Sequence, residues 1–330
     1  MRRPDHGPNA ERGAALLTVL MLVAIIAVLA GGALERLRIT TRLAGNAIGG
    51  EQARAYAYAA EALALSRVTD QLARDRTRVS LAGGWSGRPF GLPLPGGGYA
   101  VARVTDGGNC FNLNGLVTAV SPGVYTSDTP ARLQFARLMR SLQVPAQVAE
   151  QVAAGAADWI DTDGDRQPGG AEDASYLGLQ PGYRTAGTLM ADVSELRAVA
   201  GVTPTLYATL RPWICTLPVA APALINVNTI SPEQAPLLAM LLPDGSPTGG
   251  IGTALLRRSP QGYADAGAFW TAAAFGVGAA LPGGAQTAVK TNWFALRVDV
   301  TQGEASLTQI SLVDATQLPS RLVSRQWGEP

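Results

Sequence analysis

The densest group of residues that could do chemistry is an acidic run near the middle of the chain. If Asp161 is counted as the first position, carboxylates follow at the third, fifth and twelfth positions, and one more comes directly after the twelfth. These residues are Asp161, Asp163, Asp165, Glu172 and Asp173. This is the ligand spacing of an EF-hand loop, whose hard oxygen ligands suit Ca²⁺. The sixth position is Arg166, where that loop needs glycine. We therefore expect a calcium-binding loop of another geometry, with a structural role.

Two other interpretations of the acidic run stay open. It could be a solvated, Asp-rich turn, or it could supply a catalytic carboxylate pair of the kind that glycosidases use. Histidine chemistry is less available, because the only histidine, His6, precedes a long apolar segment. If the N-terminal residues that include His6 are removed as a leader, the mature chain has no histidine. It then cannot hold a Ser-His-Asp triad, a Cys-His pair or histidine-ligated zinc.

The chain has two cysteines, Cys110 and Cys215. In an exported protein two such cysteines usually form a disulfide, whereas in a cytosolic protein they are usually free thiols. A bond between them would close a loop of about 100 residues, for which chain entropy gives a stabilisation of at most about 4–5 kcal/mol. Two separate buried thiols are the alternative.

Composition places the chain among packed proteins and gives no sign of nucleic acid as a partner. Of its 330 residues 47% are hydrophobic and 15% charged, and the net charge is +1. The segment from Ile225 to Gln234 opens a helix much as DNA-binding helix-hairpin-helix modules do. However, only Arg257 and Arg258 are basic nearby. We expect no nucleic-acid binding.

A run from Ala14 to Leu34 carries no charge, and its only hydroxyl belongs to Thr18, which can bond back to its own helix. The run is long enough to cross the roughly 30 Å of hydrocarbon in a bilayer. Arg2, Arg3 and Arg12 precede it, so the N-terminus should stay in the cytoplasm and the rest should lie on the other side.

Three kinds of N-terminal segment could explain this run. A secretory signal would be cut after it, near Ala30-Gly31-Gly32, and a plain signal anchor would not be cut. A type IV pilin-like signal would be cut before it, between Gly13 and Ala14, leaving the run as a membrane helix. We favour the third, because helix-forming residues continue from Glu35 to about Val79. An unrelated anchor followed by a coiled stalk is the alternative.

An unbroken helix from Ala14 to Arg78 would be roughly 100 Å long. Tyr56, Ala60, Leu63 and Arg67 recur at helical spacing within it, as do Leu65, Val68 and Leu72. Three glycines, at positions 45, 49 and 50, predict a bend near the membrane surface.

The remainder of the chain predicts an α+β fold. The sequence indicates a loop over 81–98, strands over 99–105 and 110–114, and a hairpin formed by 293–301 and 305–313. The residues between these strands indicate helices at 132–142, 145–159, 193–200, 205–210, 232–242 and 264–275. A small antiparallel sheet should therefore be interrupted by a large helical insertion.

Several segments, in order along most of the chain, resemble the type II secretion minor pseudopilin K (GspK) family. They are Arg12-Gly-Ala-Ala-Leu-Leu-Thr-Val-Leu20, Glu51-Gln-Ala-Arg-Ala-Tyr-Ala-Tyr-Ala-Ala-Glu61, Asp106 with Phe111-Asn-Leu-Asn114, Asp158-Trp-Ile-Asp161, Gly170-Ala-Glu-Asp173, Tyr183-Arg184, Val193-Ser-Glu-Leu-Arg197 and Ile225-Asn-Val-Asn-Thr229. No single segment is decisive, but the ordered set is a strong resemblance.

The resemblance implies a pilin fold interrupted by a helical domain with two SAM-like halves. The divisions are a leader at 1–13, a transmembrane part at 14–34, a pilin-like α+β domain at 35–115 and 289–330, and an insertion at 116–288 whose halves are about 116–217 and 218–288. The resemblance also implies a calcium ion in the insertion, held by the cluster of Asp161, Asp163, Glu172 and Asp173. Asp165 and Arg166 depart from the family pattern and could change the geometry of the calcium site.

The resemblance also implies how the chain is processed and where it works. The prepilin peptidase would cut after Gly13 and methylate the new N-terminus. A single helix would hold the chain in the inner membrane, with its C-terminal domain in the periplasm. There it would join minor pseudopilins I and J, and other pseudopilins, at the tip of the pseudopilus.

Thr18 would be the fifth residue after this cut, where major pseudopilins carry a glutamate that pairs with a neighbour's N-terminal ammonium. A threonine cannot neutralise that charge, and an unpaired buried charge is costly. A subunit with threonine there suits the tip, although Thr18 could simply be a tolerated membrane residue.

The leading hypothesis is thus a non-enzymatic assembly protein. A membrane-anchored calcium-dependent periplasmic hydrolase and a minor pilin of a type IV pilus are the alternatives.

Overall fold

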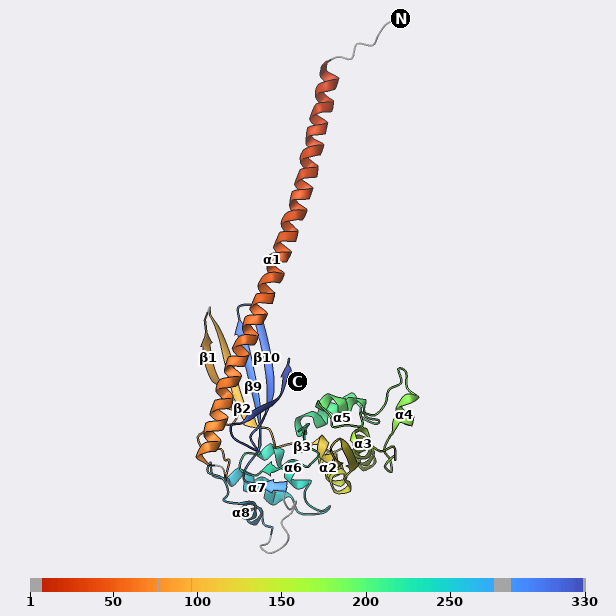
Figure 1. Cartoon of the computed structure of the whole chain (residues 1–330), viewed down its shortest axis with the longest axis vertical. Coiled ribbons are helices and arrows are strands. Elements are labelled where there is room, and N and C mark those ends of the chain that lie inside the picture. The colour runs from red at the N-terminus through yellow and green to blue at the C-terminus, as the bar shows by residue number, and fades with distance from the viewer. Residues whose placement is uncertain (1–7, 76, 96, 276–285, 329–330) are drawn as a thin grey trace.

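The computed structural model describes residues 8–75, 77–95, 97–275 and 286–328, and it confirms the α+β class. One long helix, α1 (Pro8–Arg74), projects from a globular part, and its C-terminal half lies along an antiparallel sheet (Figure 1). The remaining helices gather beside and beyond the far end of α1, away from the N-terminus. The chain therefore separates its apolar end from its helical insertion by the length of α1.

Helix α1 runs from Pro8 to Arg74 without interruption, so the three glycines at positions 45, 49 and 50 do not end the helix. A glycine within a helix costs only about 1 kcal/mol relative to alanine, and the good helix formers around these positions can offset that cost. At Gly49 the helix is already close to the sheet, since a Cβ there would lie 3.6 Å from Ala305 Cβ, an ordinary van der Waals distance. In its apolar half, the most apolar 18-residue window has a mean hydropathy of 2.8 and is not buried at all.

The second half of α1 contacts the sheet through alanine. Ala53, Ala57, Ala60 and Ala64 are all fully buried, at the spacing of one helix face. Leu63, which shares helical spacing with Ala60, points away from this face and is 49% exposed. Alanine leaves room for the helix backbone to approach the strands closely.

The sheet has five antiparallel strands in the order β1 (Phe90–Leu94), β2 (Gly98–Asp106), β9 (Trp293–Gln302), β10 (Ala305–Asp314) and β11 (Arg321–Trp327). The pairing of β2 with β9 and the β9–β10 hairpin confirm the predicted split sheet. Strand β1 lies inside the predicted loop. Its Gly91 and Pro93 are tolerated because β1 is an edge strand.

The last strand is attached to α1 by a buried charge network. Glu61 of α1 is 7% exposed and accepts from Arg325 of β11, at 2.5 Å between Oε1 and Nη2. Ser311 donates to the same carboxylate at 2.7 Å, as does Gln309. The Arg325 guanidinium also lies 4.5 Å from the centre of the Tyr58 ring. These contacts fix the sheet's second edge against the helix.

The insertion contains short helices and three two-stranded sheets. The α-helices are α2 (Thr129–Ser141), α3 (Ala146–Ile160), α4 (Asp173–Leu177), α5 (Pro204–Leu210), α6 (Ala235–Ala239), α7 (Gly249–Arg257) and α8 (Ala266–Ala272). The 3₁₀ helices are η1 (Leu113–Leu116), η2 (Val193–Ala198), η3 (Arg211–Trp213) and η4 (Pro232–Gln234). The strand pairs are β3 (Phe111–Asn112) with β6 (Ile214–Cys215), β4 (Val117–Ser121) with β5 (Val124–Ser127), and β7 (Ile225–Asn226) with β8 (Thr287–Ala288).

The strand predicted at 110–114 does not belong to the pilin-like sheet. Only Phe111 and Asn112 are extended, and they pair in parallel with Ile214 and Cys215 of the insertion. Phe111 and Leu113 are part of the insertion's apolar core, which is separate from the core between α1 and the sheet. These residues thus pack with the insertion, and β2, which ends at Asp106, is the last strand of the five-stranded sheet before it.

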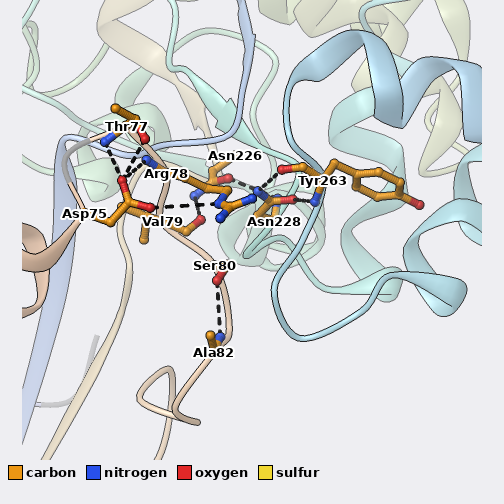
Figure 2. A network of polar contacts seen from close by, with 9 residues as sticks. All are labelled: Asp75, Thr77, Arg78, Val79, Ser80, Ala82, Asn226, Asn228 and Tyr263. Carbon is orange, nitrogen blue, oxygen red and sulfur yellow. Dashed lines mark hydrogen bonds and ion pairs between the residues drawn. The ribbon is translucent and has the colours of Figure 1, made fainter.

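Asn226 bonds the insertion to the segment that follows α1, and Asn228 braces the insertion itself (Figure 2). Asn226 Nδ2 donates to the Val79 carbonyl at 3.0 Å, and the Val79 amide donates to Val289 O at 2.9 Å. Asn228 exchanges two hydrogen bonds with the Tyr263 backbone, at 2.7 and 3.0 Å. Asp106, whose pKa is raised by burial, accepts from Asn226 and Thr229. The junction is therefore a buried, hydrogen-bonded contact.

The alanine face can be tested with two neighbouring residues of α1. Ala60→Leu should lower the free energy of unfolding by about 1–3 kcal/mol, because extra methylenes overfill the contact with the sheet. Ala59→Leu makes the same change on the exposed face and should stay within about 0.5 kcal/mol. Equal losses in thermal unfolding of the full chain in detergent would contradict this packing.

Candidate functional site

The acidic run lies in the loop between α3 and α4. Asp161 follows the last residue of α3, Asp163 lies in the loop, and Glu172 directly precedes α4. One carboxylate oxygen from each of these three residues lies within 4.8 Å of those from the other two. Asp161 and Glu172 are buried, whereas Asp163 faces solvent. The loop thus brings three carboxylates to one point at the surface.

The buried oxygens of this cluster have no hydrogen-bond donor among the described residues. Both carboxylate oxygens of Asp161 and Oε1 of Glu172 are without one. Burial raises the pKa of Asp161 and of Glu172 to about 7, and the repulsion of neighbouring carboxylates adds to this effect. Buried, unpaired carboxylates are costly, and a hard cation with oxygen ligands would satisfy all of them. This donor set therefore fits Ca²⁺.

Asp158 is a further buried carboxylate, which contacts the loop that carries the cluster. It is fully buried in the last turn of α3, and both its oxygens accept from the Gln167 amide, at 3.2 and 3.3 Å. Burial raises its pKa to about 6. Gly170 lies directly against it, since a Cβ at that position would be 2.0 Å from Asp158 Oδ2. This carboxylate therefore shapes the loop that presents the other three.

The other two predicted ligands are placed differently. Asp173 forms an ion pair with Arg184 at 2.6 Å and accepts from the Thr185 amide at 3.0 Å. The hydrogen bond from the Thr185 amide is the main cause of a lowered pKa at Asp173. The Thr185 hydroxyl and the contact with Arg184 lower it further. The Asp165 amide donates to Asp163 Oδ1 at 2.9 Å, while the Asp165 carboxylate is not part of the three-residue group. Asp165 thus shapes the loop through its backbone.

The predicted processing site lies near the start of α1. The Gly13–Ala14 bond is within the helix and exposed. The Thr18 hydroxyl donates to the carbonyls of Ala14 and Ala15, at 3.1 and 2.8 Å, as its position in an apolar helix predicts. Arg2, Arg3 and His6 lie outside the described residues.

The two cysteines form the predicted disulfide, with Cα atoms 5.8 Å apart and a sequence separation of 105. It lies where β3 meets β6, beside the register pair of Asn112 and Cys215. The Asn112 side chain donates to Val219 O and Ala221 O and accepts from the Leu217 amide. The bond and this asparagine therefore close the same loop.

The structural role of the buried asparagines was missed in the sequence, although a signal is present. Asn112 and Asn114 stand in an alternating apolar–Asn motif, and Asn226 and Asn228 repeat it. In both copies the second asparagine's amide donates to the first one's side chain, at 3.2 and 3.0 Å. Both copies begin on a short strand paired in parallel. The repeated motif marks corresponding positions in the insertion.

Together, the apolar helix, the sheet packed along its second half and the helical insertion define a class of protein. The chain is a pilin-like subunit with one candidate membrane anchor among its described residues and a large insertion between two adjacent strands.

Comparison with known proteins identifies the family. Two family models, both described as Type II secretion system (T2SS), protein K, match residues 109–219 and 225–291. The chain is 31% identical over 322 residues to type II secretion system protein K of Pectobacterium carotovorum subsp. carotovorum, covering 97% of each chain. It is 37% identical to the protein of that name from Aeromonas hydrophila, covering 72% of this chain and 73% of the relative.

A solved structure agrees with these relatives. The chain matches one in the GspK-GspI-GspJ complex of enterotoxigenic Escherichia coli with a TM-score of 0.72 and 30% identity. The match covers 85% of this chain and 97% of the other. The chain therefore belongs to the type II secretion system protein K, or GspK, family.

The disulfide should contribute measurably to the stability of the insertion. The double variant Cys110→Ala/Cys215→Ala should lose about 2–4 kcal/mol of unfolding free energy, because the unfolded chain regains the freedom of a long loop. Wild-type protein unfolded under reducing conditions should match the variant. Equal stability of the oxidised wild type and the variant would show that the bond contributes nothing.

Proposed function

We propose that the chain is a non-enzymatic minor pseudopilin, which takes its place at the tip of a type II secretion pseudopilus and helps to initiate its assembly. The observation that carries the proposal is the continuity of α1. One helix supplies both an unburied apolar segment and the face that packs on the sheet. A subunit built in this way can stay anchored in the membrane before assembly and then enter a fibre without changing its fold. Its activity would support protein export across the outer membrane.

The N-terminus fits the processing of such a subunit. Cleavage between Gly13 and Ala14 by a prepilin peptidase, followed by methylation, would leave the apolar helix as a single-pass anchor in the inner membrane. The globular part would then lie in the periplasm, where the disulfide suits an oxidising compartment. Thr18, with no carboxylate and its hydroxyl bonded to its own helix, suits a position at the fibre's end.

The two alternative functions are less well supported. A hydrolase needs its carboxylates in a substrate cleft. Two cavities in the described part of the chain, around Tyr183 and around Trp85, include none of the three clustered carboxylates. A minor pilin of a type IV pilus would share the anchor. The large insertion, which the protein K models match, favours the secretion system.

The partners we propose are minor pseudopilins I and J, because the similar solved chain was crystallised in a GspK-GspI-GspJ complex. The full-length chain, co-expressed with these two proteins from its own organism, should elute with both as one complex from a sizing column. The major pseudopilin in place of I and J is the control and should not form such a complex. Elution of the chain apart from I and J would contradict the tip assignment.

We also propose that Asp161, Asp163 and Glu172 hold a structural Ca²⁺. The support is the set of buried oxygens without donors, gathered within 4.8 Å of one another. The ion would neutralise the crowded carboxylates and join the end of α3 to the start of α4. It would thereby fix a loop that few apolar contacts hold.

Calcium should raise the stability of the protein. A concentration about 100-fold above the Kd should add about 2.7 kcal/mol to the unfolding free energy. Glu172→Gln should abolish this gain, whereas Asp165→Asn, which removes a carboxylate outside the group of three, should keep most of it. Thermal unfolding with calcium or with a chelator measures the difference, and no shift in the wild type would reject the site.

The effect should depend on pH. The pKa values of Asp161 and Glu172 are raised to about 7 in the folded chain, above those of the unfolded chain. Their contribution to metal-free stability is therefore present at low pH and is lost as the pH rises through about 7. Calcium should consequently stabilise the protein more at about pH 8 than at about pH 6. The opposite order would contradict a site made of these carboxylates.

A further inference from the structure

The stretch of α1 between its apolar run and the globular part carries three arginines: Arg36, Arg38 and Arg42, here called the arginine collar. None of them forms an ion pair with another described residue. Glu35 directly precedes Arg36, and the sequence contains no Asp or Glu from Arg36 to Gly50. Every residue from 13 to 48 is exposed, since the sheet first approaches α1 at Gly49. The globular part of this chain therefore leaves the collar uncovered.

Helix geometry places the collar at the surface of the membrane. With Leu34 at the edge of the hydrocarbon, the three arginines lie about 3, 6 and 12 Å further along the axis. The polar layer on each side of a bilayer is roughly 5–7 Å thick. Helical side chains lean towards the N-terminus, which for this helix is the direction of the membrane. Even Arg42 can therefore turn its guanidinium back to the headgroups.

The residues between the arginines fit the same environment. Leu37 and Ile39, about 5 and 8 Å beyond Leu34 along the axis, are 64% and 50% exposed. At these depths an apolar side chain can stay near the acyl chains while the neighbouring arginines extend to the headgroups. Water alone would solvate these two side chains poorly.

We propose that the arginine collar binds anionic phospholipid headgroups in the periplasm-facing leaflet and so sets the depth of the helix. Arg38 and Arg42 are four residues apart, on one helix face, where two guanidinium groups can share one phosphate. Lipid is favoured over an acidic partner protein because the collar adjoins the apolar run and lies within reach of the headgroup layer. The inference rests on the membrane anchorage proposed above.

The test uses the full chain in nanodiscs that contain both phosphatidylcholine and phosphatidylglycerol. Native mass spectrometry measures which lipids stay bound after release. Phosphatidylglycerol should be enriched over its share of the disc, by about fivefold for each arginine that contacts it. Arg36→Gln/Arg38→Gln/Arg42→Gln should abolish the enrichment. Arg88→Gln/Arg257→Gln/Arg321→Gln removes the same charge from exposed positions of the globular part and should preserve it.

Three results would overturn the inference. Bound lipid in the same proportion as the disc would show that the collar does not select anionic headgroups, and so would equal losses in the two triple variants. Normal lipid enrichment in the collar variant, together with loss of its minor pseudopilin partners, would assign the collar to protein contacts. Failure of the wild-type chain to enter nanodiscs would instead contradict the anchorage itself, which distinguishes the two proposals.

Discussion

The close contact between the alanine face of α1 and the sheet is the constraint on which the rest of the structure depends. Because Ala53, Ala57, Ala60 and Ala64 are small, the strands approach the helix backbone, and β2, β9 and β10 bury their apolar faces against it. The same helix continues as the apolar segment. The globular part is thus attached rigidly to its candidate membrane anchor, and the Glu61–Arg325 pair extends that attachment to the last strand.

The size of the insertion follows from the position where it interrupts the sheet. Asp106 at the end of β2 lies opposite Phe294 at the start of β9, so the insertion leaves and returns at adjacent points. It can therefore be large without disturbing the strands. Its own core is separate, and buried hydrogen bonds from Asn226 and Asp106 fix it at the junction. The chain can in this way carry a large helical insertion on an ordinary pilin-like part.

The sequence predicts the parts that strong patterns specify. The apolar run, the alternation in β2, β9 and β10 and the disulfide partners were all predictable. Strand β1 was not, because Gly91 and Pro93 are typical of loops, and alanine gives too weak a signal to locate the buried face of α1. Alternation in Phe111-Asn-Leu-Asn114 indicates a strand but not its partner. Spacing brought Asp161, Asp163 and Glu172 together, but it could not predict that Asp173 pairs with Arg184.

The central claim is that α1 is a pilin-like helix, exposed to processing at its cytoplasmic end and retained in the mature subunit. Mass spectrometry of the mature N-terminus tests this most directly. The account predicts a chain that begins at Ala14 and carries an N-methyl group. A chain that begins after residue 30, or one that retains Met1, would contradict it.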